Sequence, residues 1–456
     1  MPARPASKPR FHLVTLGCPK NTVDTNAMAF LLQRAGYRPV ARPEQADVII
    51  VNTCGFIADA RAESLETLQS LAANLRPEQQ LIAAGCWAQR DPERLMAWIP
   101  ELDGVIGTRS WNALPELLAQ LKQRNRRLVL TEKHAMTLPE AARAPGYAIA
   151  GRSAFLKIAD GCSRRCAFCA IPLIKGDMVS RPLEAIIKEA ERLRDQRVLE
   201  FNLIAQDSTV YGRDLGLTDG LAQLLERLAE VLPASSWIRV LYMFPGQITS
   251  RLIEAMATYP QVLPYVDLPL QHAHPAVLRR MNRPADMDEV RRTLERLRQR
   301  LPDVCLRTTL IAGFPGETDA EFQTLLDFVN EQRFDRLGVF TYSHEEGTPA
   351  ERFEDDVPDD VKAARLDALM TAQQAISLER NRAQIGRVLP VLLEGSEAQL
   401  TVGRSYRDAP EIDGLVLIQQ SVAEVDRMAE VRITEALEYD LIGEFVAGAE
   451  GDLNAA

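Results

Sequence analysis

Residues 161–169 read GCSRRCAFC and place Cys162, Cys166 and Cys169 in the spacing CxxxCxxC. The strand-like run FLKIADG (155–161) precedes them, so the three thiols are expected in a loop at the carboxyl end of a strand. Three thiolates from one loop suit one face of an iron–sulfur cluster better than a tetrahedral metal site, which needs four ligands. A four-iron cluster held in this way leaves one iron free for a cofactor or substrate. A zinc knuckle is the alternative.

Downstream of this loop, strand-like and helix-like stretches alternate. Six units fall short of the eight strands of a closed β/α barrel, so an open, partial (β/α)6 barrel is predicted over residues 148–378. Its strands are expected at FLKIADG, LEFNLIAQ, WIRVLYM, YVDLPL, VCLRTTLIAG and RLGVFTYS.

The flanking regions predict two further domains. Residues 10–125 alternate apolar runs with helical stretches, which indicates a doubly wound α/β domain with parallel strands. Small residues and two prolines in LPEAARAPGYAIA indicate a linker over 126–147. Short strands with turn residues between them predict a small β-barrel over 379–450, followed by a tail at 451–456. The fold class is therefore α/β with a small β-barrel at its end.

Three more cysteines are predicted to gather at one sheet edge. Cys18, Cys54 and Cys86 each end one of the first three strand-like runs, and the carboxyl ends of parallel strands meet at one edge. They are candidate ligands of a second cluster, although without local spacing they can also be buried strand-end thiols. Cys305 begins a strand instead and is interpreted as a buried small hydrophobic residue.

Composition excludes several classes of protein. No apolar run is long enough to span a membrane, and the basic start MPARPASKPR lacks the apolar segment of a signal peptide. Seven cysteines in 456 residues are too few and too clustered for a secreted disulfide scaffold. A P-loop or Rossmann glycine run is absent. A cytoplasmic protein without membrane contact is expected.

The loop GCSRRCAFC, with Phe168 at the aromatic position of CxxxCxΦC, resembles the signature loop of radical S-adenosylmethionine (SAM) enzymes. The resemblance implies that Cys162, Cys166 and Cys169 hold a catalytic [4Fe-4S] cluster whose free iron binds SAM. One electron, from a reductant protein, then splits SAM into methionine and a deoxyadenosyl radical.

From about Phe11 to Phe445 the chain is similar to the methylthiotransferases of this superfamily. TLGCPKN, VNTCGFI and AGCWAQR look like that family's three auxiliary loops, which implies that Cys18, Cys54 and Cys86 hold a second [4Fe-4S] cluster. The final domain would be a TRAM barrel.

Residues that contact SAM are predicted less directly. Phe168 in the cysteine loop and Gln206 at the end of the second barrel strand are candidates. Thr309 and Ile311 in the fifth strand are candidates too, although core packing is the favoured interpretation for these two. His272 and His274 are both interpreted as surface histidines, because no third ligand lies in register with them.

Two subfamilies compete. The MiaB type modifies an adenosine of tRNA, and the RimO type modifies the β-carbon of an aspartate in a small-subunit ribosomal protein, the twelfth in standard naming. TLGCPKN, LIAQDSTVYG, DLPLQHAHPAVLRRMNR and YSHEEGTPA all resemble the RimO type. Two positions depart from it: Asn26 stands where a glutamate is usual, and Lys175 replaces an arginine.

The charge of the last domain gives a separate argument. Residues 385–450 hold thirteen acidic and five basic side chains, a net charge of −8. An RNA-binding barrel needs a basic face, so tRNA is disfavoured and a basic ribosomal protein, free or within the ribosome, is the expected partner. The alternative is that acidic residues only keep the domain soluble. A non-catalytic iron–sulfur scaffold is the third hypothesis.

Overall fold

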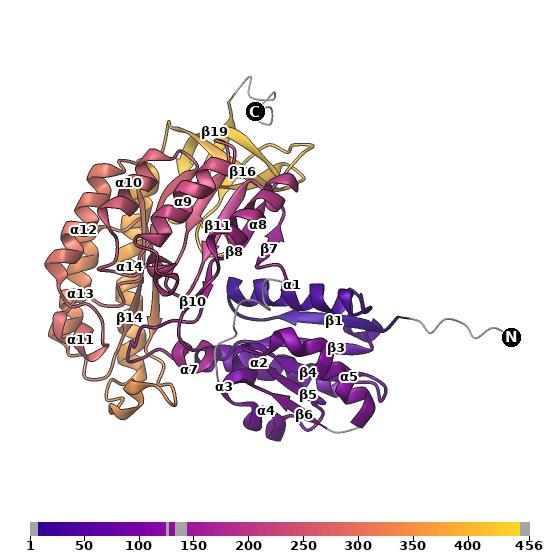
Figure 1. The fold of residues 1–456 in the computed structure, drawn as a ribbon. Helices are drawn as coiled ribbons and strands as arrows, with labels where there is room; N and C mark the ends of the chain where they lie inside the picture. The colour runs from indigo at the N-terminus through magenta and orange to yellow at the C-terminus, as the bar shows by residue number, and fades with distance from the viewer. Residues whose placement is uncertain (1–7, 125–126, 133–143, 447–456) are drawn as a thin grey trace.

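The computed structural model describes residues 8–124, 127–132 and 144–446, which form three domains (Figure 1). The predicted α/β class, the partial barrel and the final small β-barrel are confirmed. Half of the predicted linker (133–143) and the predicted tail lie outside the described residues. Among the described residues, no helix is both long and apolar enough to cross a membrane.

The first domain is a six-stranded parallel sheet in the order β2-β1-β3-β4-β5-β6. Strand order reverses beside β1, and such a switch point opens a crevice at the carboxyl ends of the strands. The last strand, β6, lies inside the range predicted as linker and pairs with β5. The strands are β1 (Arg10–Thr15), β2 (Arg38–Pro39), β3 (Val48–Thr53), β4 (Gln80–Ala84), β5 (Gly104–Gly107) and β6 (Leu128–Leu130). The helices are α1 (Pro19–Arg34), α2 (Ala58–Ala73), α3 (Gly85–Arg90), α4 (Pro92–Trp98) and α5 (Leu114–Arg124).

The second domain is an open seven-stranded sheet in the order β15-β14-β13-β12-β11-β8-β7. Six strands are parallel, as predicted, and β7 is an additional antiparallel strand joined to β8 by a two-residue turn at Gly151. The seven strands are β7 (Tyr147–Ala150), β8 (Ser153–Lys157), β11 (Glu200–Ile204), β12 (Trp237–Val240), β13 (Val262–Asp267), β14 (Cys305–Ala312) and β15 (Arg336–Thr341). Two short strands, β9 (Ala159–Asp160) and β10 (Val179–Ser180), pair separately as an antiparallel two-stranded sheet.

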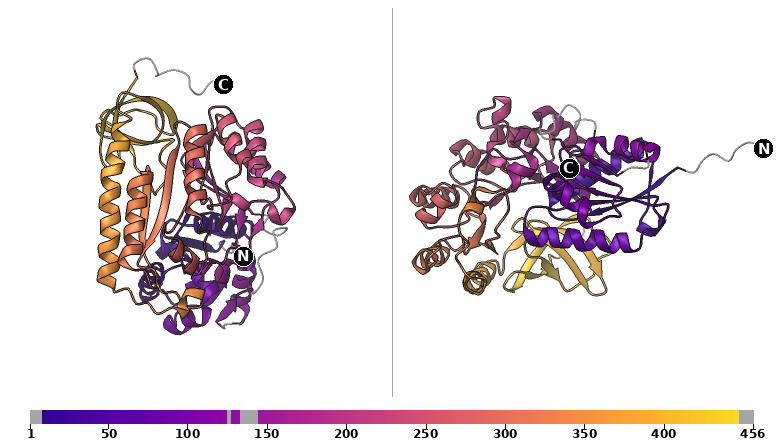
Figure 2. Two further views of the ribbon diagram at one scale, coloured as in Figure 1. Left: turned by 90° about the vertical axis from the view of Figure 1, so that its left-hand side faces the viewer. Right: turned by 90° about the horizontal axis from the view of Figure 1, so that it is seen from below.

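Helices cover the outer face of this sheet, and its largest apolar cluster lies between the two layers (Figures 1 and 2). The helices are α7 (Ile171–Lys175), α8 (Leu183–Asp195), α9 (Gly220–Val231), α10 (Ser250–Thr258), α11 (Pro275–Arg280), α12 (Met287–Arg300) and α13 (Asp319–Gln332). The short 3-10 helices of the chain are η1 (Pro43–Gln45), η2 (Trp111–Ala113), η3 (Ser208–Val210), η4 (Arg213–Leu215) and η5 (Pro349–Arg352).

Helix α14 (Asp359–Arg382) leads into the third domain, a closed barrel in the order β16-β17-β18-β20-β19. The third domain packs against the amino ends of the second domain's strands. Cys305, the first residue of β14, is fully buried there as predicted, and its thiol donates to the Arg407 carbonyl at 3.4 Å. The strands are β16 (Val388–Glu397), β17 (Leu400–Ser405), β18 (Val416–Ile418), β19 (Arg427–Ala436) and β20 (Leu441–Phe445).

Buried charges join the second and third domains. Arg404 of β17 and Arg239 of β12 both pair with Glu200, the first residue of β11, and all three are nearly inaccessible to solvent. The first domain instead meets the carboxyl-end loops of the same sheet. Figure 1 shows the first and third domains at opposite ends of the second.

Candidate active site

One cavity of about 440 Å³ lies between the first and second domains, at the carboxyl ends of both sheets. All six predicted ligands line it, and all are free thiols: Cys18, Cys54, Cys86, Cys162, Cys166 and Cys169. Two sheets that are folded from separate parts of the chain therefore present two cysteine sets to the same cavity.

The barrel set is shaped by its own loop. The Cys162 amide donates to the Gly176 carbonyl at 2.9 Å, and the Cys169 amide donates to the Cys166 carbonyl at 3.1 Å. Gly161 has φ +79°, and a Cβ there would lie 2.2 Å from the Asp177 carbonyl oxygen. Glycine is therefore required immediately before the first cysteine.

The first-domain set is held together by Asn21, which is buried in α1. Its side-chain amide donates to the Leu16 carbonyl at 2.8 Å and to the Thr53 carbonyl at 3.3 Å. Its Oδ1 accepts from the Cys86 thiol at 3.5 Å. One side chain thus links the three cysteine-bearing segments.

Burial shapes the protonation of these thiols. It raises the pKa of Cys162 to about 11 and the pKa values of Cys86 and Cys169 to about 12. The thiolates that a cluster would need would therefore form only as its iron binds. Arg283 Nη1 lies 3.6 Å from Cys166 Sγ and adds positive charge beside that ligand.

The six thiols are the donor type that iron–sulfur clusters take, and they are not gathered for a single ion. Among the described residues, no three histidine, cysteine or acidic side chains converge closely enough to hold one metal ion. A four-iron cluster makes a different demand, because each of its ligated irons takes one thiolate from a separate cysteine.

Two of the predicted SAM contacts line the cavity, Phe168 and Gln206. The Gln206 amide donates to Asp160 Oδ1 at 3.1 Å, whereas its buried Oε1 has no hydrogen-bond partner among the described residues. That oxygen is free to accept from a ligand. Thr309 and Ile311 are not among the lining residues, and Ile311 packs in the apolar cluster that lies beside Phe168.

Several lining residues carry no mark in the sequence. Lys20, Arg164 and Arg283 bring positive charge to the wall. Tyr242 and Gln271 line it with left-handed backbones, at φ +62° and +75°. Such strained non-glycine residues gather at functional sites. The one signal in the sequence is position, because Lys20 and Arg164 each lie two residues after a cysteine, Cys18 and Cys162.

The interpretation of His272 as a surface residue is wrong. Its side chain is fully buried, and Nε2 lies 3.3 Å from a Glu317 carboxylate that also pairs with Arg365. Burial lowers the pKa of His272, although Glu317 opposes this. The strand-to-helix turn around Glu317 encloses the ring, which sequence spacing did not reveal.

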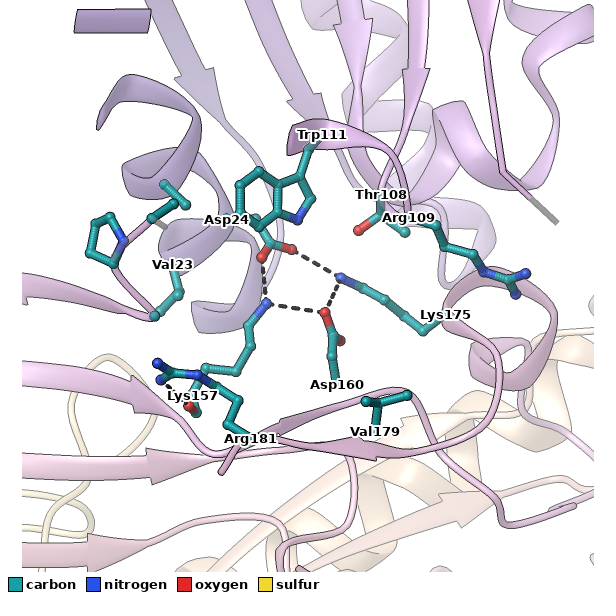
Figure 3. Close-up of a pocket in the computed structure, with 14 residues that line it drawn as sticks. Val23, Asp24, Thr108, Arg109, Trp111, Lys157, Asp160, Lys175, Val179 and Arg181 are labelled. Atoms are coloured by element: carbon teal, nitrogen blue, oxygen red, sulfur yellow. Dashed lines mark hydrogen bonds and ion pairs between the residues drawn. The ribbon is translucent and has the colours of Figure 1, made fainter. Parts of the chain in front are cut away.

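A buried ion cluster joins the first two domains beside the cavity (Figure 3). Lys175 Nζ lies 2.9 Å from Asp24 of α1 and 3.2 Å from Asp160, and Lys157 pairs with the same two carboxylates. Lys175, the departure noted in the sequence, therefore meets carboxylates on both sides of the interface. It also lines the cavity itself.

A second set of contacts lies in the loop that follows β15. Glu345 is buried and accepts from Arg61 and, at 2.8 Å, from Arg90, both in the first domain. Asn26, the other departure, donates to the Tyr147 carbonyl at 2.7 Å. Contacts from three separate parts of the second domain thus fix the first domain over the cysteine loop.

Comparisons with known families agree with the three domains. Residues 10–107 match the family described as "Uncharacterized protein family UPF0004". Residues 156–329 match the Radical SAM superfamily, and residues 385–446 match the TRAM domain.

Solved structures support the fold alone. The radical SAM methyltransferase TsrM from Kitasatospora setae aligns with a TM-score of 0.56 at 15% identity, covering 75% of this chain and 77% of that one. The cobalamin-dependent radical SAM enzyme OxsB aligns with a TM-score of 0.52 at 14% identity, covering 81% of this chain and 56% of that one.

Curated relatives match almost end to end. "Ribosomal protein uS12 methylthiotransferase RimO" of Roseiflexus sp. (strain RS-1) is 47% identical, covering 97% of this chain and 98% of the relative. The protein of the same description from Chloroflexus aurantiacus is 47% identical, covering 95% and 99%. With both cysteine sets on one cavity and three matching domains, the chain belongs to the RimO family of radical SAM methylthiotransferases.

Proposed function

We propose that this chain adds a methylthio group to the β-carbon of an aspartate in ribosomal protein uS12, using SAM and two [4Fe-4S] clusters. Cys162, Cys166 and Cys169 hold the cluster that binds SAM. The first-domain cysteines hold the second cluster. The observation that carries the proposal is the single cavity lined by both cysteine sets, in a chain whose relatives are named for this reaction.

The reaction replaces an unactivated C–H bond with C–S–CH3, and no side chain of ordinary pKa removes such a hydrogen. When bound, SAM and its cluster supply a radical for this step, and the cofactor carries the difficult chemistry. The protein's part is to place the target carbon between the two cysteine sets and to exclude water from the cavity. The apolar side chains of Phe56, Phe168 and Phe244 contribute to that wall.

Polar groups of the wall suit SAM. Gln206 is held by Asp160 and keeps one buried oxygen free, which suits an ammonium group. Arg164 lies 2.8 Å from Asp207 and stacks on Phe244, so its guanidinium is fixed near the cysteine loop. These contacts favour a zwitterionic ligand on the barrel side.

The third domain supports a basic protein as substrate. Two of its arginines, Arg404 and Arg407, are buried in ion pairs with Glu200 and Asp335 and do not reach the surface. Among the described residues from 385 onward, Arg432 is exposed, and the other two basic side chains at the surface, Arg387 and Arg427, are half-buried. The exposed acidic side chains are Glu394, Glu397, Glu411, Glu424, Glu430, Glu435 and Glu444. A domain whose exposed charges are mostly acidic attracts a basic protein and repels RNA. The reaction would take place in the cytoplasm, on uS12 that is free or within the ribosome, with a one-electron reductant protein.

The test is an anaerobic reaction of the reconstituted enzyme with SAM, a reductant and sulfide. Purified uS12 and purified tRNA are offered in parallel, and each is analysed by mass spectrometry. We expect the mass of one methylthio group to appear on an aspartate of uS12 and none on tRNA. The enzyme itself should carry about eight irons, because each cluster holds four.

Two outcomes would redirect the proposal. Modification of tRNA instead of uS12 would assign the chain to the MiaB type. A protein with both clusters that never cleaves SAM under reducing conditions would be an iron–sulfur scaffold. Tightly bound zinc in place of iron after anaerobic preparation would exclude the radical mechanism.

A further inference from the structure

Lys20 is a buried cation on the cavity wall. Its side chain is 8% exposed, and Nζ lies 3.3 Å from the centroid of the Tyr242 ring. Among the residues that the structure describes, no carboxylate lies within ion-pair distance of it. A buried charge without a counter-charge is costly, and stacking on an aromatic ring offsets only part of that cost.

The other cations of the cavity all have protein partners. Arg164 pairs with Asp207, and Lys175 pairs with Asp24 and Asp160. Arg283 lies against the Cys166 thiol and donates to the Pro269 carbonyl. Within the described cavity wall, Lys20 and Arg283 have no carboxylate partner, and only the Lys20 ammonium group makes neither an ion pair nor a hydrogen bond to the protein.

The position of Lys20 in its helix adds to the positive charge at this point of the wall. Lys20 lies in the first turn of α1, where the helix dipole disfavours a positive side chain. That first turn contains no acidic residue. The helix end and Lys20 therefore present positive charge together at this point of the wall.

Tyr242 fixes the lysine in place. The tyrosine has φ +62°, and its amide donates to Asp267 Oδ2 at 2.9 Å, which holds the strained backbone. Burial raises the pKa of Tyr242, so its ring remains a neutral phenol beneath the ammonium group. Strain retained on one wall of a reaction cavity is typical of residues that position a ligand.

We propose that Lys20 binds the carboxylate of the substrate aspartate and so makes the enzyme select aspartate over asparagine. This inference rests on the proposed function and names the group that recognises the reacting residue. Aspartate is ionised at neutral pH, and asparagine has the same shape without the charge. The ion pair would hold the aspartate side chain beside the first-domain cysteines, next to Cys18 on the same turn.

The experiment measures anaerobic binding of labelled uS12 to the reconstituted holoenzyme. Two forms of uS12 are compared, one with the target aspartate and one with asparagine in its place. Loss of a buried charged partner weakens binding by a large factor, so wild-type enzyme should prefer the aspartate form roughly 30-fold or more. Lys20→Met should bind both forms equally, and Lys20→Arg should retain most of the preference.

Lys122→Met is the matched control. Lys122 is also a lysine of the first domain stacked on a tyrosine, 4.9 Å from the Tyr37 ring, but it is exposed on α5 and outside the cavity. The Lys122→Met enzyme should prefer the aspartate form of uS12 as strongly as the wild-type enzyme does. Iron content and the electron paramagnetic resonance spectrum of each variant report on both clusters.

An unchanged aspartate preference in Lys20→Met would overturn the inference. So would an altered first-domain cluster spectrum with the preference retained, because Lys20 would then serve the cluster. A wild-type enzyme that binds both forms equally would also refute it. Methylthiolation of uS12 by wild-type enzyme is scored separately, so a failure of the proposed function is distinguishable from a failure of the lysine's role.

Discussion

Cys162, Cys166 and Cys169 come from one loop, whereas Cys18, Cys54 and Cys86 come from the ends of three strands. The first set needs only the turn geometry around Gly161 and Gly176. The second needs the register of a whole sheet and the side chain of Asn21, which ties its three segments together. Both sets present cysteine thiols to the cavity. The position of the first set depends on one loop, whereas the position of the second depends on the correct folding of the whole first-domain sheet.

The largest expected effect comes from removing one ligand of each set. Cys166→Ala should abolish SAM cleavage and reduce iron from about eight to about four per chain, because the radical-generating cluster is lost. Cys86→Ala should also lose about four irons but still cleave SAM without methylthiolating uS12. Product analysis for deoxyadenosine and modified uS12 separates them. If both variants cleaved SAM equally, the two sets would not have separate roles.

A second variant tests the ion cluster at the interface between the first and second domains. Burial would lower the pKa of Lys175, but Asp160 and Asp24 raise it well above its usual value. Lys175→Met leaves these buried carboxylates to share Lys157, so we expect a loss of about 3 to 4 kcal/mol in unfolding free energy. Urea denaturation of the metal-free protein measures it. Lys188→Met, at an exposed position of α8, is the control and should change stability by less than about 0.5 kcal/mol.

A third test acts on neither set. Burial would raise the pKa of Glu200, but Arg404 and Arg239 outweigh it and lower the pKa from 4.5 to about 2. A carboxyl group whose pKa is lower in the folded than in the unfolded protein stabilises the fold at pH values above the unfolded pKa. That stabilisation is lost as the pH falls toward the folded pKa. Unfolding free energy should thus fall by about 3 kcal/mol between pH 5 and pH 2.

Glu200→Gln should remove this part of the pH dependence, as measured by urea denaturation across that range in metal-free protein. Equal acid sensitivity of the variant and the wild type would place the titrating groups elsewhere, including near the two cysteine sets.

The last test, whose control variant has the smallest expected effect, addresses the cysteines of the first domain. Gly85 has φ +96°, and a Cβ there would lie 2.2 Å from Asn52 Oδ1. Gly36 has φ +91° with nothing within 4 Å of its Cβ position. Gly36→Ala should therefore cost about 1 kcal/mol for the backbone alone, and Gly85→Ala about 2 kcal/mol more. Gly85→Ala should also lose iron from the first-domain site, whereas similar iron content in both variants would contradict the steric argument.

The same contrast explains what could be predicted from sequence. Cys162, Cys166 and Cys169 were evident from spacing, and parallel strands predicted the convergence of the other three. Strand β7 and the extension of the first sheet to β6 were hidden in short runs whose pairing depends on distant strands.

The missing site residues were hidden for a related reason. Lys20 and Tyr242 are ordinary residue types whose importance lies in a contact between two domains. His272 was misplaced because its partner Glu317 approaches from another loop. Local chemistry is readable along the chain, whereas burial and cross-domain pairing exist only after folding.

The acidic third domain and the cavity lie at opposite ends of the same strands. A strand of six residues such as β13 is about 20 Å long. A substrate that contacts both the third domain and the cavity must span at least roughly that length. The length of the second domain's strands would therefore set the minimum size of such a substrate. A free aspartate or a dipeptide is too short to use the acidic face, whereas a folded basic protein can be anchored at one end while one extended loop reaches the other. Selection of the substrate protein and selection of the reacting residue would then be separate events, made at a distance from each other.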